Sequence, residues 1–208
     1  MSSIKLKHSS GNSMSIGAPA TNPASDLELK LPATVGTAGQ VLKNSGTAGT
    51  LEFGHALEVD QWRLHTTLSS AATFITANWE RVDTDFVHIG TGMSESSGVF
   101  SFPTTGIWRV EFNMSNSHTD YARRYVGGHI YYTTDNSSYS EKVQVYNSYR
   151  DAGSSNSYAS THAVLMFDVS DVSTHKVKFY VVSDGSSSWH GSTSQNNNYV
   201  TFTRLGDT

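Results

Sequence analysis

The sequence predicts an all-β protein, an antiparallel β-sandwich or barrel preceded by an extended N-terminal arm. Three observations support this fold class. From about Gln61 onward, short runs rich in Val, Ile, Tyr, Phe and Trp are separated by Gly, Ser, Asn and Asp clusters, as strands and turns are. No segment shows the 3.6-residue apolar period of an amphipathic helix. The first 56 or so residues hold only short apolar pieces, too small for a core of their own.

The arm, residues 1–56, contains two kinds of apolar repeat. Five apolar residues alternate with polar neighbours, as strand residues do: Ile4, Leu6, Leu27, Leu29 and Leu31. The tetrapeptide GTAG occurs at residues 36–39 and again at 46–49, each time followed by a few apolar residues. Such a segment is either a disordered tail or a segment that packs against a partner, including copies of itself. We predict that the five alternating residues anchor the arm to a partner.

The head, residues 57–208, is predicted to contain nine strands: 61–68, 79–82, 86–89, 107–115, 125–134, 142–149, 158–169, 176–182 and 199–205. The clearest of these begins after a turn at Pro103–Gly106. In it, Trp108, Val110, Phe112 and Met114 point to one face and the residues between them to the other. This strand is therefore predicted to contribute one face to the core.

One strand and several tyrosines indicate an oligomer. The strand 158–169 carries apolar residues on both faces, so a second face is expected to be covered. Tyrosine rings on strands can seal contacts between subunits, although they also pack on ordinary sheet surfaces. The residues predicted to lie in a subunit interface are Tyr131, Tyr146, Val164, Met166 and Tyr180.

Composition argues against several classes of protein. Charged residues are 15% of the chain, the formal net charge is −4, and Lys and Arg form no cluster, so nucleic acid is not an expected partner. Without Cys there is neither a disulfide nor a thiolate metal site. No stretch has the length and hydrophobicity of a signal peptide or a membrane span. We therefore expect synthesis in a cytoplasm and no membrane insertion.

No motif predicts an enzyme, a cofactor or a metal site. The nine His residues show no ligand spacing, and the nearest approach is His118 with Asp120. The sequence Asp-Thr-Asp at Asp83–Asp85 lacks the further ligands of a calcium loop, so a turn is the better interpretation. No Ser lies in a G-x-S-x-G elbow. A pair of carboxylates brought together by folding would be invisible in the sequence.

Two predicted loops, 148–160 and 183–198, combine Tyr, Ser, Gly and Asn with one Trp, a composition typical of recognition surfaces. Four residues are candidates for ligand binding: Tyr149, Trp189, His190 and Asn196. Trp189 would stack on a sugar ring while His190 and residues 196–198 bind its hydroxyl groups. The alternative, which we favour, is that Trp189 packs over the end of the sandwich or at a subunit contact.

The spacing of Phe100, Gly106, Trp108 and Val110 resembles the signature of the complement globular head and of the tumour-necrosis-factor-like jelly roll. The resemblance extends over roughly residues 56–208 and includes the final strand, YVTFTRLG. It implies a ten-stranded sandwich that assembles as a compact homotrimer around a three-fold axis. The chain departs from the complement type because it has no Gly-X-Y collagen stalk.

Residues 31–54, LPATVGTAGQVLKNSGTAGTLEFG, resemble a segment of bacteriophage fibre and appendage proteins. The start, SIKLKHSSGNS, is similar to the N termini of virion proteins from marine phages. This resemblance implies a non-enzymatic virion protein, a capsid decoration or head fibre that binds a phage capsid or tail protein. Such a protein would be made in the host bacterial cytoplasm and lie on the virion surface. The alternatives are a tail-fibre tip that binds a host surface glycan and, less favoured without an export signal, a secreted lectin-like trimer.

Overall fold

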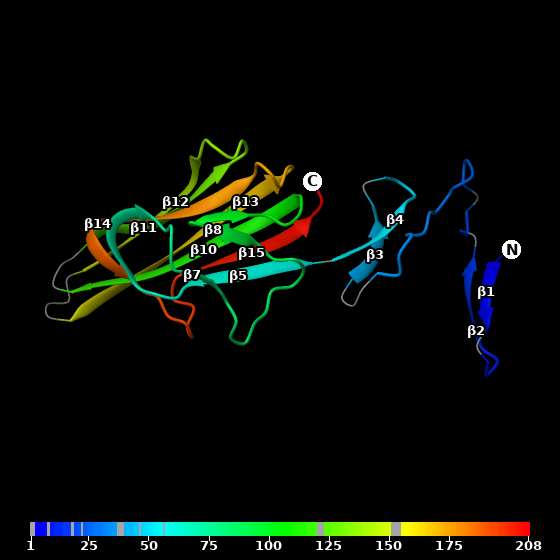
Figure 1. The fold of residues 1–208 in the computed structure, drawn as a ribbon, viewed down its shortest axis with the longest axis horizontal. Helices are drawn as coiled ribbons and strands as arrows, with labels where there is room; N and C mark the ends of the chain where they lie inside the picture. The colour runs from blue at the N-terminus through cyan, green and yellow to red at the C-terminus, as the bar shows by residue number, and fades with distance from the viewer. Residues whose placement is uncertain are drawn as a thin grey trace. The chain divides into compact units, whose positions relative to one another are not determined.

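The computed structural model describes residues 3–7, 9–17, 19–21, 23–36, 40–45, 47–55, 57–119, 123–150 and 155–208. Its contacts divide the chain into two compact units, Met1–Ala56 and Leu57–Thr208. We call them the N-terminal unit and the head. The division falls at the residue where the composition of the sequence changes. Every regular element among the described residues is a β-strand (Figure 1).

The N-terminal unit contains two antiparallel hairpins. Strand β1 (Ser3–Lys7) pairs with β2 (Ser13–Gly17), and β3 (Gln40–Asn44) pairs with β4 (Leu51–His55). The backbone of Lys30 extends the second hairpin, because its N–H donates to Gly49 O at 2.8 Å and its carbonyl accepts from Leu51 at 2.9 Å. Of the two GTAG repeats, Gly36 and residues 47–49 are described; Gly36 has a positive φ of 72°, and residues 47–49 lie in the turn before β4.

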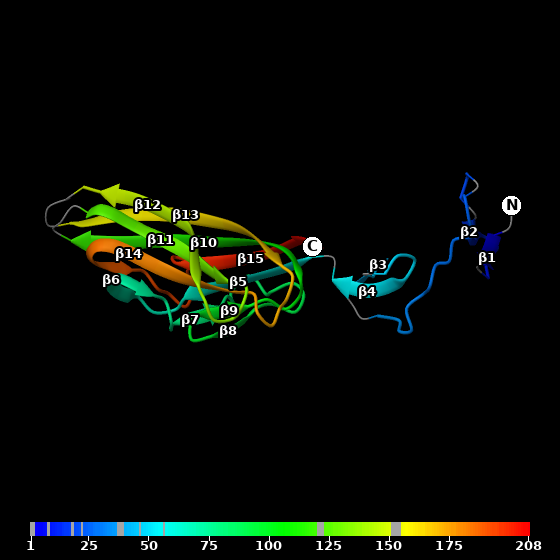
Figure 2. The same cartoon turned by 90° about the horizontal axis from the view of Figure 1, so that it is seen from above.

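The described residues of the head form eleven strands: β5 (Glu58–Leu64), β6 (Leu68–Phe74), β7 (Trp79–Arg81), β8 (Ser94–Ser96), β9 (Val99–Ser101), β10 (Gly106–Thr119), β11 (Arg123–Thr133), β12 (Ser140–Tyr149), β13 (Asn156–Val169), β14 (Lys176–Trp189) and β15 (Tyr199–Gly206). They form two packed layers (Figures 1 and 2). One layer has the strand order β7-β5-β15-β10-β13. In the other, β12 pairs with β11 and β11 with β14, which also pairs with β6 and β9. The layers join where the ends of β10 and β14 pair, so the head is a nearly closed antiparallel sandwich.

The core lies between the layers and is rich in aromatic rings. Trp108, Val110, Phe112 and Met114 are all at most 2% exposed, which confirms the predicted inner face of β10. Across the core, Phe179 on β14 contacts Phe112 with ring centroids 5.0 Å apart. Burial of each large apolar side chain contributes about 1.5–3 kcal/mol, so this interface between the layers stabilises the head.

Several strand boundaries differ from the predicted ones. The predicted strand 61–68 is two strands, since β5 ends at Leu64 and β6 begins at Leu68. The predicted strand 86–89 was wrong, because only Ile89 pairs, in an isolated bridge to Val59. The short strands β8 and β9 were missed. Short segments with mixed polarity give a weak local signal, and pairing partners decide their state.

The largest difference concerns β14, which continues to Trp189 where the sequence predicted a loop from residue 183. Residues 183–188 are polar and small, and on propensity alone they read as a loop. They form a strand because the end of β14 pairs with both β6 and β10. The predicted loop is therefore confined to residues 190–198.

Candidate functional site

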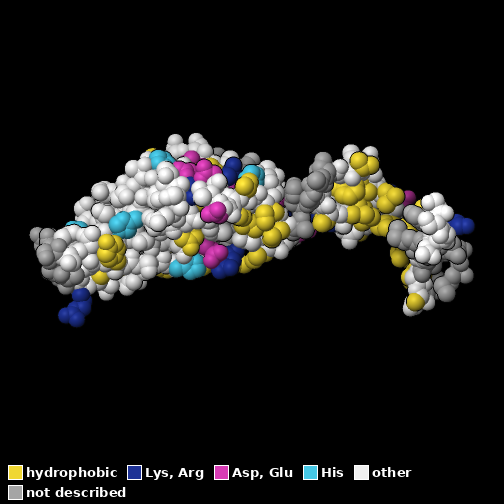
Figure 3. Space-filling view, turned by 90° about the horizontal axis from the view of Figure 1, so that it is seen from below, with side chains coloured by type: hydrophobic (Ala, Val, Ile, Leu, Met, Phe, Trp, Pro, Cys, Tyr) yellow, Lys and Arg dark blue, Asp and Glu magenta, His cyan; other side chains and the backbone are white. Residues whose placement is uncertain are grey.

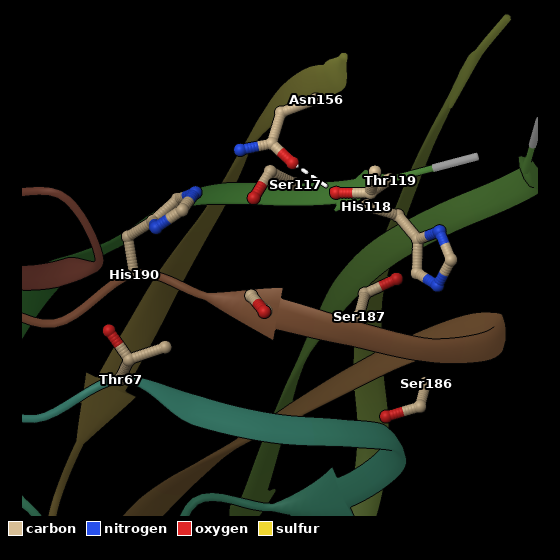
Figure 4. Close-up of a pocket in the computed structure, with 9 residues that line it drawn as sticks. Thr67, Ser117, His118, Thr119, Asn156, Ser186, Ser187 and His190 are labelled. Atoms are coloured by element: carbon tan, nitrogen blue, oxygen red, sulfur yellow. Dashed lines mark hydrogen bonds between the residues drawn. The ribbon is translucent and has the colours of Figure 1, made fainter. Parts of the chain in front are cut away.

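A polar pocket of about 490 Å³ lies at the ends of β10 and β14 in the head. We call it the end pocket. Its described lining comes from four different strands and their flanking residues: Thr67, Ser117, His118, Thr119, Asn156, Ser186, Ser187, Ser188 and His190 (Figure 4). The lining side chains are hydroxyl, amide and imidazole groups. The pocket is therefore suited to hydrogen bonding more than to apolar packing.

An irregularity in strand pairing shapes one wall of the end pocket. Between Val182 and Ser187, β14 advances five residues while its partner β6 advances two, from Ala72 to Ser70. The extra residues bulge from the ladder, and bulges redirect the side chains that follow them. This places Ser186 at the pocket, where its carbonyl accepts a 3.0 Å hydrogen bond from Arg123 Nη2.

The opposite wall is built by the paired ends of β10 and β13. Thr119 donates its hydroxyl to Asn156 Oδ1 across this pair, as Figure 4 shows. The amide of Asn156 in turn contacts the Tyr158 hydroxyl at 3.4 Å. Thr119 and Asn156 thus orient each other's side chains, and Asn156 also contacts the hydroxyl of Tyr158.

His190 belongs to the third wall. Its ring stacks on Tyr158, with centroids 5.9 Å apart and an angle of 29° between the rings. Burial lowers the pKa of His190 below 6.5, so its imidazole is neutral near pH 7. Its Nε2 atom is buried and has no hydrogen-bond partner in the described part of the chain. The neutral ring offers one donor and one acceptor nitrogen.

The structure brings only one of the four predicted ligand-binding residues, His190, into this pocket. Trp189 is 1% exposed and donates its indole N–H to Ser70 O at 3.1 Å, so the sugar-stacking hypothesis was wrong and the packing alternative holds. Tyr149 is buried, with its hydroxyl 3.4 Å from Ser187 Oγ. Asn196 donates to Gln61 Oε1 at 2.9 Å, away from the pocket. The sequence placed Trp189 in a loop, whereas it is the last residue of β14 and its side chain is buried.

The lining residues that the sequence did not single out for ligand binding are Thr67, Ser117, His118, Thr119, Asn156 and the serines at 186–188. Asn156 and the three serines lie in the two segments whose composition predicted a recognition surface, 148–160 and 183–198, whereas the others lie outside them. Their common property is that pairing of β6, β10, β13 and β14 brings them together. No local motif signals such a set, because its members come from distant segments.

The predicted interface residues lie on two different faces of the head. Val164 and Met166 point outward from β13 and are 37% and 54% exposed. They are paired with Glu111 and Arg109 of β10, which form an ion pair at 2.8 Å. His162 also contacts Glu111, at 3.2 Å between Nε2 and Oε1. This outer face therefore combines apolar side chains with a small charged cluster.

The three predicted interface tyrosines lie on the outer face of the other layer. Tyr131 and Tyr180 both contact Phe74, with ring centroids 4.9 Å apart in each pair. Tyr146 is exposed and contacts the ring of His129 at 5.2 Å. Because the outer faces of the two layers point away from each other, the five predicted residues do not form one surface.

The predicted anchor residues that are described are exposed. Leu27, Leu29 and Leu31 are 78%, 63% and 75% exposed, and Leu6 is 57% exposed. The side chain of Ile4 lies outside the described residues. Hydrophobic side chains also gather over the β3–β4 part of the N-terminal unit (Figure 3), where Val35, Val41 and Leu42 are exposed. Such a density of exposed apolar residues is typical of an interaction surface.

Among the described residues no group of three or more His, Cys, Asp or Glu side chains could hold a metal ion. Asp83 accepts from Arg63 Nη2 at 2.8 Å, and Asp85 has a positive φ of 63°, so this segment is a turn held by an ion pair. Asp120 lies outside the described residues. The described part of the chain also has no helix with the length and hydrophobicity that a membrane crossing requires.

The head has the fold of a tumour-necrosis-factor-like jelly roll. It is similar to a crystal structure of murine APRIL at pH 5.0, with a TM-score of 0.51 and 13% identity over 72% of this chain and 99% of that chain. It is also similar to the structure of Eiger TNF from S. frugiperda, with a TM-score of 0.53 and 9% identity over 73% of this chain and 94% of that one. These likenesses confirm the predicted fold. No family model matches the sequence, and a comparison with curated proteins finds no significant match.

Proposed function

We propose that the protein is a non-enzymatic homotrimeric appendage that its N-terminal unit anchors to a larger particle while the head is displayed. The observation that carries this proposal is the row of exposed leucines at residues 27–31. Leu27, Leu29 and Leu31 are exposed, while Glu28 and Lys30 between them form an ion pair at 3.4 Å. An extended segment with one apolar side and one paired, polar side suits the addition of a strand to a partner.

The trimer is supported by the fold and by the outer face of β13. A ring of three subunits uses a heterologous contact, in which two different patches of each subunit meet. We assign Val164 and Met166 to one of these patches, because they are exposed apolar residues on a regular strand. Tyr131 and Tyr180 already pack against Phe74 of their own subunit, so we leave them out of it.

Trimerisation would also strengthen anchoring. Three arms joined to one trimeric head raise each other's effective concentration at the particle, so weak individual contacts give tight attachment. The exposed apolar residues of the β3–β4 hairpin suit contacts between the three copies as a short stalk. The N-terminal unit would then serve both as stalk and as anchor.

The particle we propose is a bacteriophage virion, with the protein as a capsid decoration or head fibre. This assignment is supported by the resemblance of residues 31–54 to phage fibre segments. The partner would be a capsid or tail protein, and the protein would lie on the virion surface.

Substitution of two leucines by glutamate tests the anchor, because both leucines lie in the N-terminal unit and not in the head. The double variant Leu27→Glu, Leu29→Glu should assemble as a trimer but fail to join the particle, because charge replaces the apolar side of the segment. The matched control Glu28→Gln changes the opposite side and should join normally. Incorporation is measured by co-sedimentation of the labelled protein with particles that lack their own copy. Normal incorporation of the double variant would show that this segment is not the anchor.

The second candidate function is that of a tail-fibre tip that binds a receptor through the head. The end pocket favours it, since a hollow lined by hydroxyl and amide groups is a recognition feature. Adsorption of the labelled protein to host cells separates the two functions. A decorative role predicts no adsorption, whereas a receptor-binding tip predicts saturable adsorption that the anchor variants leave unchanged.

A further inference from the structure

The end pocket is polar but carries no charge on its described lining. Its groups are the hydroxyls of Thr67, Ser117 and Thr119, those of the serines at 186–188, the amide of Asn156 and two imidazoles. Behind the pocket, Asp184 pairs with both Arg123 and Arg124, at 3.8 and 3.4 Å. None of the described lining side chains carries a charge that would replace the hydration of an anionic ligand, whereas a neutral polar ligand loses much less on binding. The described lining therefore favours an uncharged ligand over an anionic one.

The hydrogen-bonding groups converge on the hollow from separate directions. Figure 4 shows Thr67 on one side, the residues of β10 and Asn156 on the opposite side, and Ser186 and Ser187 along β14. Hydroxyl groups donate and accept equally well, and Asn156 adds a planar amide. A ligand that carries many hydroxyl groups of its own would find partners on every side.

His190 adds an unsatisfied nitrogen and a flat ring to this wall. The Nε2 atom is buried without a partner in the described part of the chain, so a ligand hydroxyl can pair with it only when the ring shifts toward the hollow. Tyr158 backs the imidazole by stacking on it. Burial keeps the ring neutral, which again favours an uncharged ligand.

We propose that the end pocket binds a neutral saccharide, with Asn156, His190 and the hydroxyls of Ser186 and Ser188 as its hydrogen-bonding partners and Tyr158 as a positioning residue. The volume of about 490 Å³ lies within the usual range for small-ligand sites. This inference rests on the head acting as a binding module and not on the identity of the particle to which the protein is anchored.

Binding is tested directly on the full chain by saturation-transfer difference NMR. The probes are glucose, galactose, mannose, rhamnose and N-acetylglucosamine, each at about 10 mM, above the millimolar Kd of a weak site. N-acetylneuraminic acid is the anionic comparison. We expect saturation transfer to at least one neutral sugar and none to the acid. Transfer to none of the neutral sugars, or transfer to the acid alone, would overturn the proposal.

Two variants locate the binding. Asn156→Ala and His190→Phe should each weaken the affinity about fivefold, the effect of one lost hydrogen bond; phenylalanine preserves the stacking on Tyr158. The matched control Asn196→Ala removes an exposed amide outside the pocket and should bind as the parent does. Unfolding temperatures establish that each variant is folded. Unchanged affinity in both pocket variants would place the sugar elsewhere, while loss of sugar binding with anchoring intact would leave the proposed anchor unaffected.

Discussion

The hydroxyl of Tyr131 on β11 donates a 2.6 Å hydrogen bond to Glu141 Oε2 on β12. This contact joins the two strands at the edge of their layer, on the face that carries the aromatic cluster of Phe74, Tyr131 and Tyr180. It links a phenol to a carboxylate, so it ties the stability of the edge to the protonation of the phenol.

Stability at alkaline pH should depend on Tyr131. Burial, followed by the hydrogen bond and charge of Glu141, raises its pKa from 10.0 to about 12. A raised pKa means that the contribution to stability is complete below pH 10.0 and is lost as pH rises through about 12. The variant Tyr131→Phe should therefore lose less stability than the parent over this interval. Urea unfolding measured at several pH values checks this; parallel curves for both proteins would contradict it.

Gly127 should resist substitution, because it lies beneath the ring of Tyr146 on the next strand. A Cβ at Gly127 would come within 2.2 Å of Val145 O and 2.9 Å of Tyr146 Cδ1. The carbonyl belongs to the backbone and cannot move aside without disturbing β12. We expect Gly127→Ala to lower the free energy of unfolding by about 1–3 kcal/mol. Gly206→Ala is the control, since a Cβ there meets no atom within 4 Å; equal stability of the two variants would refute the steric argument.

Asp60 should be required for the join between β5, β7 and the segment before β8. It is 1% exposed and accepts hydrogen bonds from Trp62 Nε1 at 2.9 Å, Met93 N at 2.7 Å and Arg81 Nη2 at 3.1 Å. Asp60→Ala leaves Trp62 Nε1 and Met93 N without this acceptor and leaves Arg81 Nη2 with Met93 O alone, and it should cost about 3 kcal/mol of stability.

The comparison for Asp60 is Asp171→Ala, which changes an exposed carboxylate bonded only to nearby residues of its own turn. It should shift the midpoint of chemical unfolding much less. If both variants unfold at the same denaturant concentration, the buried network around Asp60 contributes little.

Assembly should depend on the outer face of β13. Val164→Glu places a second carboxylate beside Glu111, with which Val164 is paired, and it should convert the proposed trimer into monomers. Val172→Glu is a matched control, because Val172 is exposed to the same extent, 37%, but lies outside this strand. Light scattering after size-exclusion chromatography gives the mass of each protein. A trimer that survives Val164→Glu would exclude this face from the contact.

Local sequence features were sufficient to predict the core. Trp108, Val110, Phe112 and Met114 alternate with polar residues, and alternation with a period of two defines a face without reference to any partner. The spacing of Phe100, Gly106 and Trp108 indicated the jelly roll through its resemblance to a known family; in the structure it links β9 and β10, which lie in opposite layers.

Which side chains line the end pocket was decided by tertiary structure. Trp189 packs inward because β14 continues as a strand and pairs with β6 and β10 there, and its indole N–H reaches Ser70 O, 119 residues away in the sequence. The same pairing gathers Thr67, Asn156 and His190 around one hollow. Side-chain alternation is a property of a single strand, so the order of apolar and polar residues in that strand predicts it. Which strands become neighbours depends on the packing energy of the whole sandwich, so a local segment does not predict its own pairing partner.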